Sequence, residues 1–225
     1  MILAQINQAA DSLATGAGAE SLSVFELLTK GGYMIVPIVI LSIAAVGIFI
    51  ERVLTIRKAA QTPPDFTENI RSLVSKGDIQ GARMLCGQSD TPIAKMIEKG
   101  LSRIGSPLKN IEVSIENVGK IEIYKLEKNL SLLATISGAA PMIGFLGTVT
   151  GMIQAFIAIA QEEGSVSPKL LSSGIYEAMI TTAAGLFVGI IAYLGYNYLV
   201  ARVQKVIHNM EYSSVDFVDL LQEPN

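Results

Sequence analysis

The chain has 225 residues, half of them hydrophobic and 16% charged, and its mean hydropathy of +0.47 excludes an ordinary water-soluble domain. One His and one Cys exclude a Cys/His zinc site, and no Walker A or GxGxxG motif follows a strand-like segment. We therefore expect neither an enzyme nor a bound cofactor. The net charge of −3 is less informative than the placement of the charges.

Residues 1–30 are predicted to form an outward-facing N-terminal segment. They contain no basic stretch before an apolar one, so no cleaved signal peptide is expected. The apolar pattern of 22–28 suits a short amphipathic helix on the outer membrane face. Residues 31–51 are the predicted first membrane span, because 31–50 are twenty consecutive uncharged residues and about 20 cross the hydrocarbon core.

Residues 52–128 are predicted to form a helical cytoplasmic domain in which breakers and capping residues separate short helices. Pro63 and Pro64 end the helix that follows the first span. Cys86 has no partner for a disulfide, so it is interpreted as a small core hydrophobe with a reduced thiol. Further helix boundaries are expected at Asp65, Gly77, Asp78, Thr91, Gly105 and Pro107.

The last helix of this domain carries one apolar face. That face packs either within the chain or against identical subunits, and periodicity alone does not decide between the two. No breaker is recognised between Pro107 and the second span, so one helix is expected to continue into the membrane. The face consists of Leu108, Ile111, Ile115, Val118 and Ile121.

The second and third spans are predicted at 129–161 and 170–201, with an outer loop at 162–169 and a cytoplasmic tail at 202–225. The second span is thirty-three residues without a charge. The third is thirty-two residues interrupted only by Glu177. An ionisable group inside a membrane is costly, so Glu177 is a candidate functional residue.

Small residues in these two spans predict close helix packing. Pro141 removes a backbone hydrogen bond and should kink the second span. Because three spans offer few partners within one chain, oligomerisation is expected. The glycines that should let helix backbones approach are Gly144, Gly147, Gly151, Gly185 and Gly189.

The basic residues near the span ends gather on one side. Only Lys30 and Lys169 fall on the other side. The positive-inside rule then places 52–128 and the tail in the cytoplasm, with the N-terminus outside. The residues on the predicted inner side are Arg52, Arg57, Lys58, Lys120, Lys125, Lys128, Arg202 and Lys205.

The polar side chains inside the spans allow two interpretations. Glu177 lies about 9 Å from the start of its helix, where its carboxylate either serves a function or extends to the outer face. Thr181 shares its face, whereas Thr182 points about 140° away. Threonine hydroxyls in membrane helices often bond the carbonyl four residues earlier in their own helix, and this is the default expectation for Thr148, Thr150, Thr181 and Thr182.

Two segments carry a resemblance to a known family. Residues 141–151 (PMIGFLGTVTG) resemble the second-span signature of the MotA/TolQ/ExbB proton-channel family, and 174–186 (GIYEAMITTAAGL) resemble its third-span signature. The first span's ending at Glu51 and Arg52 fits less specifically. Three spans resemble the ExbB and TolQ members rather than MotA, which has four.

The resemblance implies an all-α pentamer in the inner membrane of a two-membrane bacterium. Its pore would enclose the single spans of an ExbD/TolR-like partner that carries an intramembrane aspartate, and a TonB-like protein is a further possible partner. Thr148 and Thr182 would face that aspartate, and Glu177 would be the family's acidic residue. Thr181 stands where many relatives have a small apolar residue, which would make the pore more polar. No nucleic acid partner is expected.

Three functions remain open on the sequence. The first is a proton-driven motor of ExbB type that energises outer-membrane transport. The second is a TolQ-like unit for envelope constriction, or a motor for motility or secretion. The third is a non-conducting membrane scaffold in which Glu177 only reaches the outer face.

Overall fold

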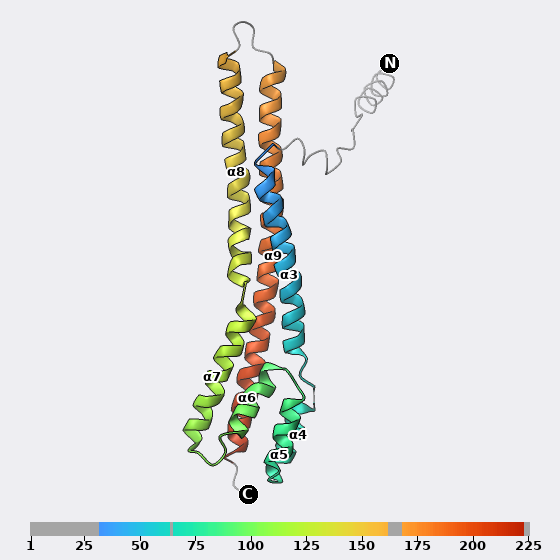
Figure 1. Cartoon of the computed structure of the whole chain (residues 1–225), viewed down its shortest axis with the longest axis vertical. Helices are drawn as coiled ribbons and strands as arrows, with labels where there is room; N and C mark the ends of the chain where they lie inside the picture. Colours follow the sequence, from blue (N-terminus) through green and yellow to red (C-terminus); the bar gives the residue numbers. More distant parts are fainter. Residues whose placement is uncertain (1–31, 64, 162–167, 223–225) are drawn as a thin grey trace, which may run out of the picture. The chain divides into compact units, whose positions relative to one another are not determined.

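The structure is a computed structural model that describes residues 32–63, 65–161 and 168–222, and every regular element in these ranges is an α-helix (Figure 1). Three helical segments are long and apolar enough to cross a membrane. They are α3 (Ile35–Ala60), Leu108–Gln161, which includes α8 (Leu130–Gln161), and Gly174–Leu220, which lies within α9 (Pro168–Leu220). The all-helical class and the three spans are therefore confirmed. The amphipathic helix predicted at 22–28 lies outside the described residues.

The chain divides into two compact units. The first comprises Met1–Ile38 and Ile143–Gly185, and the second comprises Val39–Met142 and Leu186–Asn225. The glycine-rich signature segments fall mainly in the first unit. The short helices and the main hydrophobic cluster belong to the second.

Two of the long helices continue past the predicted span ends. Helix α3 runs to Ala60 and stops before Pro63, in agreement with the predicted breaker. Helix α9 runs to Leu220, so most of the predicted tail at 202–225 is helical rather than a separate segment. The physical reason is that no Gly or Pro interrupts 196–220, and a buried stripe stabilises the extension: Val203, Val206, Met210, Phe217 and Leu220.

Four short helices lie between α3 and α8: α4 (Phe66–Ser75), α5 (Ile79–Gly87), α6 (Pro92–Leu101) and α7 (Leu108–Glu127). Helix α6 contacts both α5 and α7, and α4 contacts α5. Their caps follow the local sequence, since the Asp78 carboxylate accepts from Gly81 N at 2.8 Å and Thr91 Oγ1 accepts from Ala94 N at 3.4 Å. Asp65 occupies the predicted cap position without a side-chain bond.

The continuous helix predicted from Pro107 into the second span is wrong. Helix α7 ends at Glu127, α8 begins at Leu130, and Asn129 between them has a left-handed φ of 62°. Asparagine adopts this conformation more readily than most other residues because its short polar side chain bonds locally. The Asn129 Nδ2 donates to Glu51 Oε2 at 3.3 Å, which anchors the break to α3.

The hydrophobic cluster of the second unit decides the question left open for the apolar face of α7. Ile111 and Ile115 are buried within the chain, whereas Ile121 is exposed. A Cβ added at Gly100 would approach Ile115 Cδ1 to 2.8 Å and Phe217 Cε1 to 2.6 Å, so α6, α7 and the end of α9 meet closely there. Most of this face therefore packs within the chain. Cys86 is also buried in the cluster, as predicted.

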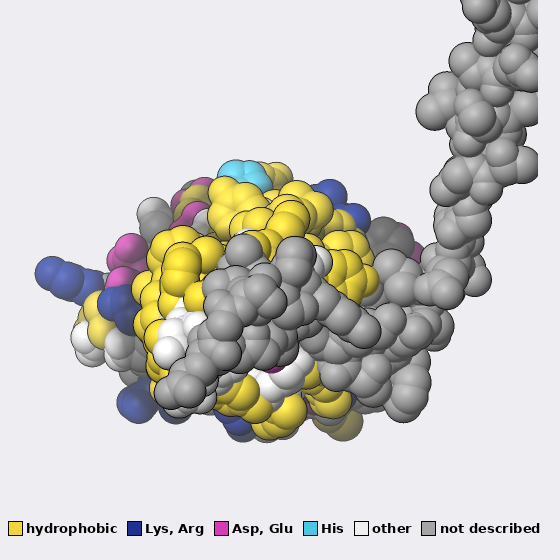
Figure 2. All heavy atoms as spheres, turned by 90° about the horizontal axis from the view of Figure 1, so that it is seen from above, with side chains coloured by type: hydrophobic (Ala, Val, Ile, Leu, Met, Phe, Trp, Pro, Cys, Tyr) yellow, Lys and Arg dark blue, Asp and Glu magenta, His cyan; other side chains and the backbone are white. Residues whose placement is uncertain are grey.

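Large hydrophobic side chains are exposed along α3, α8 and α9, and many hydrophobic side chains are visible in yellow in Figure 2. Phe145 and Met142 of α8 are 65% and 72% exposed, and Ile43 of α3 is 69% exposed. Such surfaces are expected of helices whose neighbours are lipid chains or other subunits rather than water.

Candidate functional site

The glycines of α8 form a close seam with α9 inside the first unit. A Cβ added at Gly144 would approach Thr181 O to 2.9 Å and the Cα of Gly185 to 3.2 Å. A Cβ at Gly151 would approach Ala178 Cβ to 3.0 Å. Because these contacts involve main-chain and Cβ atoms, the two helices touch where only small residues fit. Residue numbers rise on α8 as they fall on α9, so the pair is antiparallel.

Thr182 joins the two helices across this seam. Its Oγ1 donates to Gly144 O on α8 at 2.8 Å. The other three threonines bond a carbonyl of their own helix: Thr150 at the predicted spacing of four residues (Leu146) and also at three (Gly147), and Thr148 and Thr181 at three (Phe145 and Ala178). Thr182 is therefore the exception among them.

Thr148 and Thr182 lie on the same flank of the seam. Thr148 follows the seam residue Gly144 by four positions, and Thr182 follows Ala178 by four, so each is rotated by about 40° in the same sense. Equal rotations on two antiparallel helices place side chains on one side of their contact. Both threonines are half-buried, so this flank presents two hydroxyl groups beside the glycine contact.

Thr181 lies within the seam rather than beside it. Its side chain is 2% exposed, its hydroxyl donates to Ala178 O at 2.8 Å, and it covers Gly147. A Cβ at Gly147 would overlap Thr181 Oγ1. Thr181 thus packs between the two helices instead of facing the flank that Thr148 and Thr182 share.

Glu177 lies on the opposite flank of α9. It precedes Ala178 by one position, which rotates it by about 100° in the other sense. Its half-buried carboxylate lies against Gly32, where an added Cβ would overlap Oε1. Gly32 has a φ of 60°, a conformation that glycine adopts without strain. The acid therefore contacts the turn that precedes α3.

Within the second unit, α8 and α9 make another close contact, at Gly189. A Cβ there would approach Pro141 Cγ to 2.5 Å and Ser137 O to 2.9 Å. Ser137 O is the carbonyl that Pro141 cannot bond, because proline has no N–H. The glycine hydrogens therefore face this carbonyl at close range. Helix α8 remains helical through Pro141, and the predicted kink stays a prediction.

A buried arginine fixes the break between α7 and α8, a role that the sequence pattern alone does not predict. Arg52 is 4% exposed, and its Nη1 donates to Lys125 O at 3.0 Å. Lys125 O lies in the last turn of α7, where carbonyls lack helical partners. Arg52 Nη2 bonds Glu51 at 2.5 Å, while its Nε has no partner among the described residues. The adjacent Glu51 and Arg52 at the end of the first span are the sequence feature that could have indicated this role.

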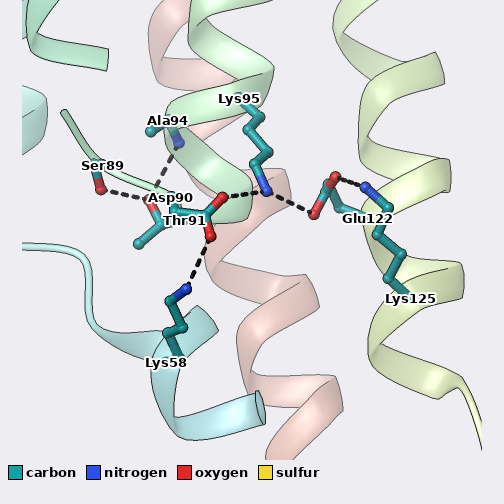
Figure 3. A network of polar contacts seen from close by, with 8 residues as sticks. All are labelled: Lys58, Ser89, Asp90, Thr91, Ala94, Lys95, Glu122 and Lys125. Atoms are coloured by element: carbon teal, nitrogen blue, oxygen red, sulfur yellow. Dashed lines mark hydrogen bonds and ion pairs between the residues drawn. The ribbon is translucent and has the colours of Figure 1, made fainter. Parts of the chain in front are cut away.

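A second polar network links α3, α6 and α7 in the second unit (Figure 3). Asp90 accepts from Lys58 at 2.9 Å and from Lys95 at 2.7 Å, and these contacts lower the pKa of Asp90 to about 2, with Lys95 the larger cause. Lys95 also lies 3.7 Å from the buried Glu122, which pairs with Lys125. The described residues contain no group of three or more His, Cys, Asp or Glu side chains that could hold a metal.

The fold and the seam define a class: a helical membrane protein of three spans whose second and third spans are joined by small residues and hydroxyl groups. A model of the MotA/TolQ/ExbB proton channel family matches residues 88–212, which include both signature segments. The chain therefore belongs to the MotA/TolQ/ExbB proton channel family.

Curated relatives agree with this assignment. The chain is 30% identical over 195 residues to a biopolymer transport protein ExbB homolog of Methanothermobacter thermautotrophicus, covering 84% of this chain and 67% of the relative. It is 33% identical over 145 residues to the biopolymer transport protein ExbB of Aquifex aeolicus, covering 64% of this chain and 91% of the relative. It is 40% identical over 85 residues to the Tol-Pal system protein TolQ of Haemophilus influenzae, covering 38% and 37%.

Proposed function

We propose that the chain is an ExbB-like subunit of a motor driven by the proton motive force in the inner membrane of a two-membrane bacterium. Copies of the chain, five in the proposed assembly, surround an ExbD/TolR-like single-span partner whose aspartate carries the proton. The complex energises TonB-type transport at the outer membrane. The observation that carries the proposal is the pair Thr148 and Thr182, which lie on one flank of the seam in a member of a proton channel family.

The hydroxyl groups suit contact with a carboxyl group that changes its protonation state. A threonine hydroxyl has one donor and two acceptor lone pairs. In the resting subunit Thr182 donates to Gly144 O, so its lone pairs are available to accept from a protonated aspartate. When the aspartate is ionised, the same hydroxyl can rotate and donate to it. Being neutral, the threonines bind both states without trapping either one.

The energy source is the passage of charge. Each proton that crosses releases about 2.3 kcal/mol per 100 mV, which is enough to bias movement between neighbouring subunit positions. Proton passage then turns the ring and its partner relative to one another. In this proposal Glu177 and Thr181 belong to the pathway as well. Glu177 acts at the outer end beside Gly32, and Thr181 becomes accessible only when the seam opens.

Thr182 provides the sharpest test. Thr182→Val removes the hydroxyl at nearly constant volume, and we expect it to abolish transport that depends on the proton motive force. Thr148→Val should do the same. Thr182→Ser keeps the hydroxyl and should retain activity. Thr150→Val is the matched control, because Thr150 lies on the other flank and bonds its own helix.

The measurement is uptake of a TonB-dependent substrate in cells that lack the native gene and carry each variant. Equal uptake by Thr182→Val and wild type would overturn the pore assignment. Native mass spectrometry of the complex from cells carrying the partner gene tests the assembly. Five copies with a small single-span protein are expected, and a partnerless assembly of another order would favour a scaffold.

A TolQ-like role in envelope constriction is the second candidate. The observation that favours it is the 40% identity to TolQ over 85 residues, which exceeds the 33% identity to the ExbB of Aquifex aeolicus over a longer alignment. Complementation distinguishes the two roles. A TolQ-like chain would restore the envelope integrity of a strain lacking TolQ, and an ExbB-like chain would restore TonB-dependent uptake instead.

A further inference from the structure

Two neighbouring hollows lie between α3 and α9 in the second unit. One has a volume of about 240 Å³ and an apolar lining that includes Ala45, Phe49 and Ile191. The other has a volume of about 500 Å³ and is lined by residues from 53–60 of α3 and 198–209 of α9. The first lies along the apolar stretches of both helices, and the second begins where those stretches end.

The second hollow is basic. Arg57, Arg202 and Lys205 line it, and its lining contains no carboxylate. Within the described ranges none of these three cations forms an ion pair, and the Arg202 guanidinium instead lies 5.1 Å from the ring centre of Tyr198. Three uncompensated positive charges in one cleft favour an anion.

The depth of the cleft matches the lipid headgroup region. Arg202 directly follows the apolar stretch 170–201, and Arg57 lies seven residues beyond the end of 31–50, which is about 10 Å along a helix. The headgroup layer adds about 5–7 Å on each side of the hydrocarbon core, and the long side chain of Arg57 can reach back into it. Tyr198 is a residue type that favours this depth.

The two hollows are joined by an aromatic pair. Phe49 lines the apolar hollow and Tyr198 lines the basic one, and their ring centres are 6.3 Å apart. A ligand with a negatively charged head and an apolar chain would therefore find both parts in sequence between the same two helices. A free phosphate would occupy the basic part alone.

We propose that the α3–α9 cleft binds an anionic phospholipid, with its phosphate held by Arg57, Arg202 and Lys205 and an acyl chain lying in the apolar hollow beside Phe49. The lipid would fix the two helices together at the side of the membrane where the basic residues gather. Basic pockets between membrane helices are a recognised way to hold such headgroups. The site goes beyond the proposed proton path and shares no residue with it, so either assignment can fail without the other.

The test is lipid binding to the full-length chain in a mild detergent, followed by native mass spectrometry. The probes are dioleoyl phosphatidylglycerol, dioleoyl phosphatidylcholine, and two soluble anions, glycerophosphoglycerol and inorganic phosphate. We expect phosphatidylglycerol to bind more tightly than the other three. The double variant Arg57→Gln/Lys205→Gln should weaken phosphatidylglycerol binding about 30-fold, because each lost charge near the membrane surface contributes about 1 kcal/mol.

Two further variants complete the design. Lys58→Gln is the matched control, because Lys58 lies beside Arg57 in the chain and pairs with Asp90 instead of lining the cleft. It should bind lipid like wild type. Val46→Trp changes a half-exposed lining residue of the apolar hollow and should weaken lipid binding without affecting the binding of soluble anions. A thermal melt of each variant confirms that it is folded.

Several results would overturn the proposal. Equal binding of phosphatidylcholine and phosphatidylglycerol would remove the role of charge. Equal binding by Arg57→Gln/Lys205→Gln and wild type would place the lipid elsewhere. Glycerophosphoglycerol or phosphate that binds as tightly as the lipid would make the cleft a site for a soluble anion, and an inert Val46→Trp would rule out the acyl-chain groove.

Discussion

Cys86 shows how strongly the interior of the second unit suppresses thiol chemistry. Burial, and to a lesser degree the Glu98 carboxylate, raise the pKa of the Cys86 thiol to about 12. At pH 8 only about one such thiol in ten thousand is ionised, and the thiolate is the reactive form. The side chain is also 1% exposed, so reagents cannot reach it.

We expect Cys86 of the folded chain to resist maleimide labelling at pH 7–8. Full labelling should appear after unfolding in denaturant, which serves as the control for reagent and protein. Mass spectrometry of the labelled chain measures the result. Rapid labelling under native conditions would mean that the helices around Cys86 open readily in solution.

Gly144 provides a prediction at the same scale. A Cβ added at Gly144 would approach main-chain atoms of Thr181 and Thr182. Main-chain atoms cannot rotate away as a side chain could. We expect Gly144→Ala to lower stability by about 1–3 kcal/mol, the usual cost of overpacking. Thermal unfolding in detergent measures it.

Gly138→Ala is the matched control for this prediction. It makes the same change on the same helix, and a Cβ there would have no other atom within 4 Å. Because alanine favours a helix more than glycine does, this variant should be neutral or slightly stabilising. Equal losses of stability in Gly144→Ala and Gly138→Ala would show that the contact of Gly144 with α9 is not the cause of the destabilisation.

The α7–α8 junction gives a prediction at the scale of an element. Asn129 holds a left-handed φ of 62° and bonds Glu51. Asn129→Ala and Asn129→Gly both lose that bond, but only alanine strains the backbone, by about 1–2 kcal/mol. We therefore expect Asn129→Ala to unfold at a lower temperature than Asn129→Gly. The reverse order would mean that the break is absent in the assembled protein.

The Asp90 network links three elements, and it predicts a pH dependence. The folded pKa of Asp90, about 2, is below its usual value of 3.8, so ionised Asp90 favours the folded state. This contribution is complete above about pH 5 and is lost as the pH falls through about 2. Because the ion pair between Asp90 and Lys58 is exposed, added salt should also reduce the stabilisation that Asp90 provides.

The variant Asp90→Asn tests whether ionised Asp90 stabilises the folded state. We expect its difference in melting temperature from wild type to be constant above pH 5, to be mostly lost at pH 2 and to vanish below it. Asp219→Asn is the control, because Asp219 is exposed and has no ion pair in the part of the chain that the structure describes. A difference that persists unchanged at pH 2 would assign the stabilisation to a neutral hydrogen bond.

At the scale of the whole molecule, the features set by local sequence were predictable. Clustered apolar residues indicated three spans, and local caps such as Asp78 and Thr91 placed the short helices. The break at Asn129 was missed because no Gly or Pro marks it and its anchor, Arg52, lies 73 residues from Lys125. The continuation of α9 to Leu220 is consistent with its local sequence, since no Gly or Pro interrupts 196–220 and an apolar stripe lies buried along it.

The candidate site likewise combines features that the local sequence predicts with features that depend on tertiary packing. The glycine spacing and the four threonines are visible in the sequence, and helical geometry separates Glu177 from Thr182. Which hydroxyl crosses to the other helix depends on the register of α8 against α9, and this register is a tertiary property. The resemblance places Thr181 with the pore residues, and this role stays a prediction; in the described chain its side chain is buried between α8 and α9.

The orientation of the chain in the membrane follows from charges that no single helix contains. The basic residues beside the spans predict that Lys109 lies inside and Gln161 outside. Both side chains are exposed, and the native Cys86 should give no background. We expect a membrane-impermeant maleimide to label Gln161→Cys in right-side-out vesicles and Lys109→Cys in inverted ones. Detergent should expose both positions equally, which controls for reactivity.

The opposite labelling pattern would place the basic residues outside. In that case the proton gradient would act on Thr148 and Thr182 in the reverse direction, and the proposed motor could not work as described.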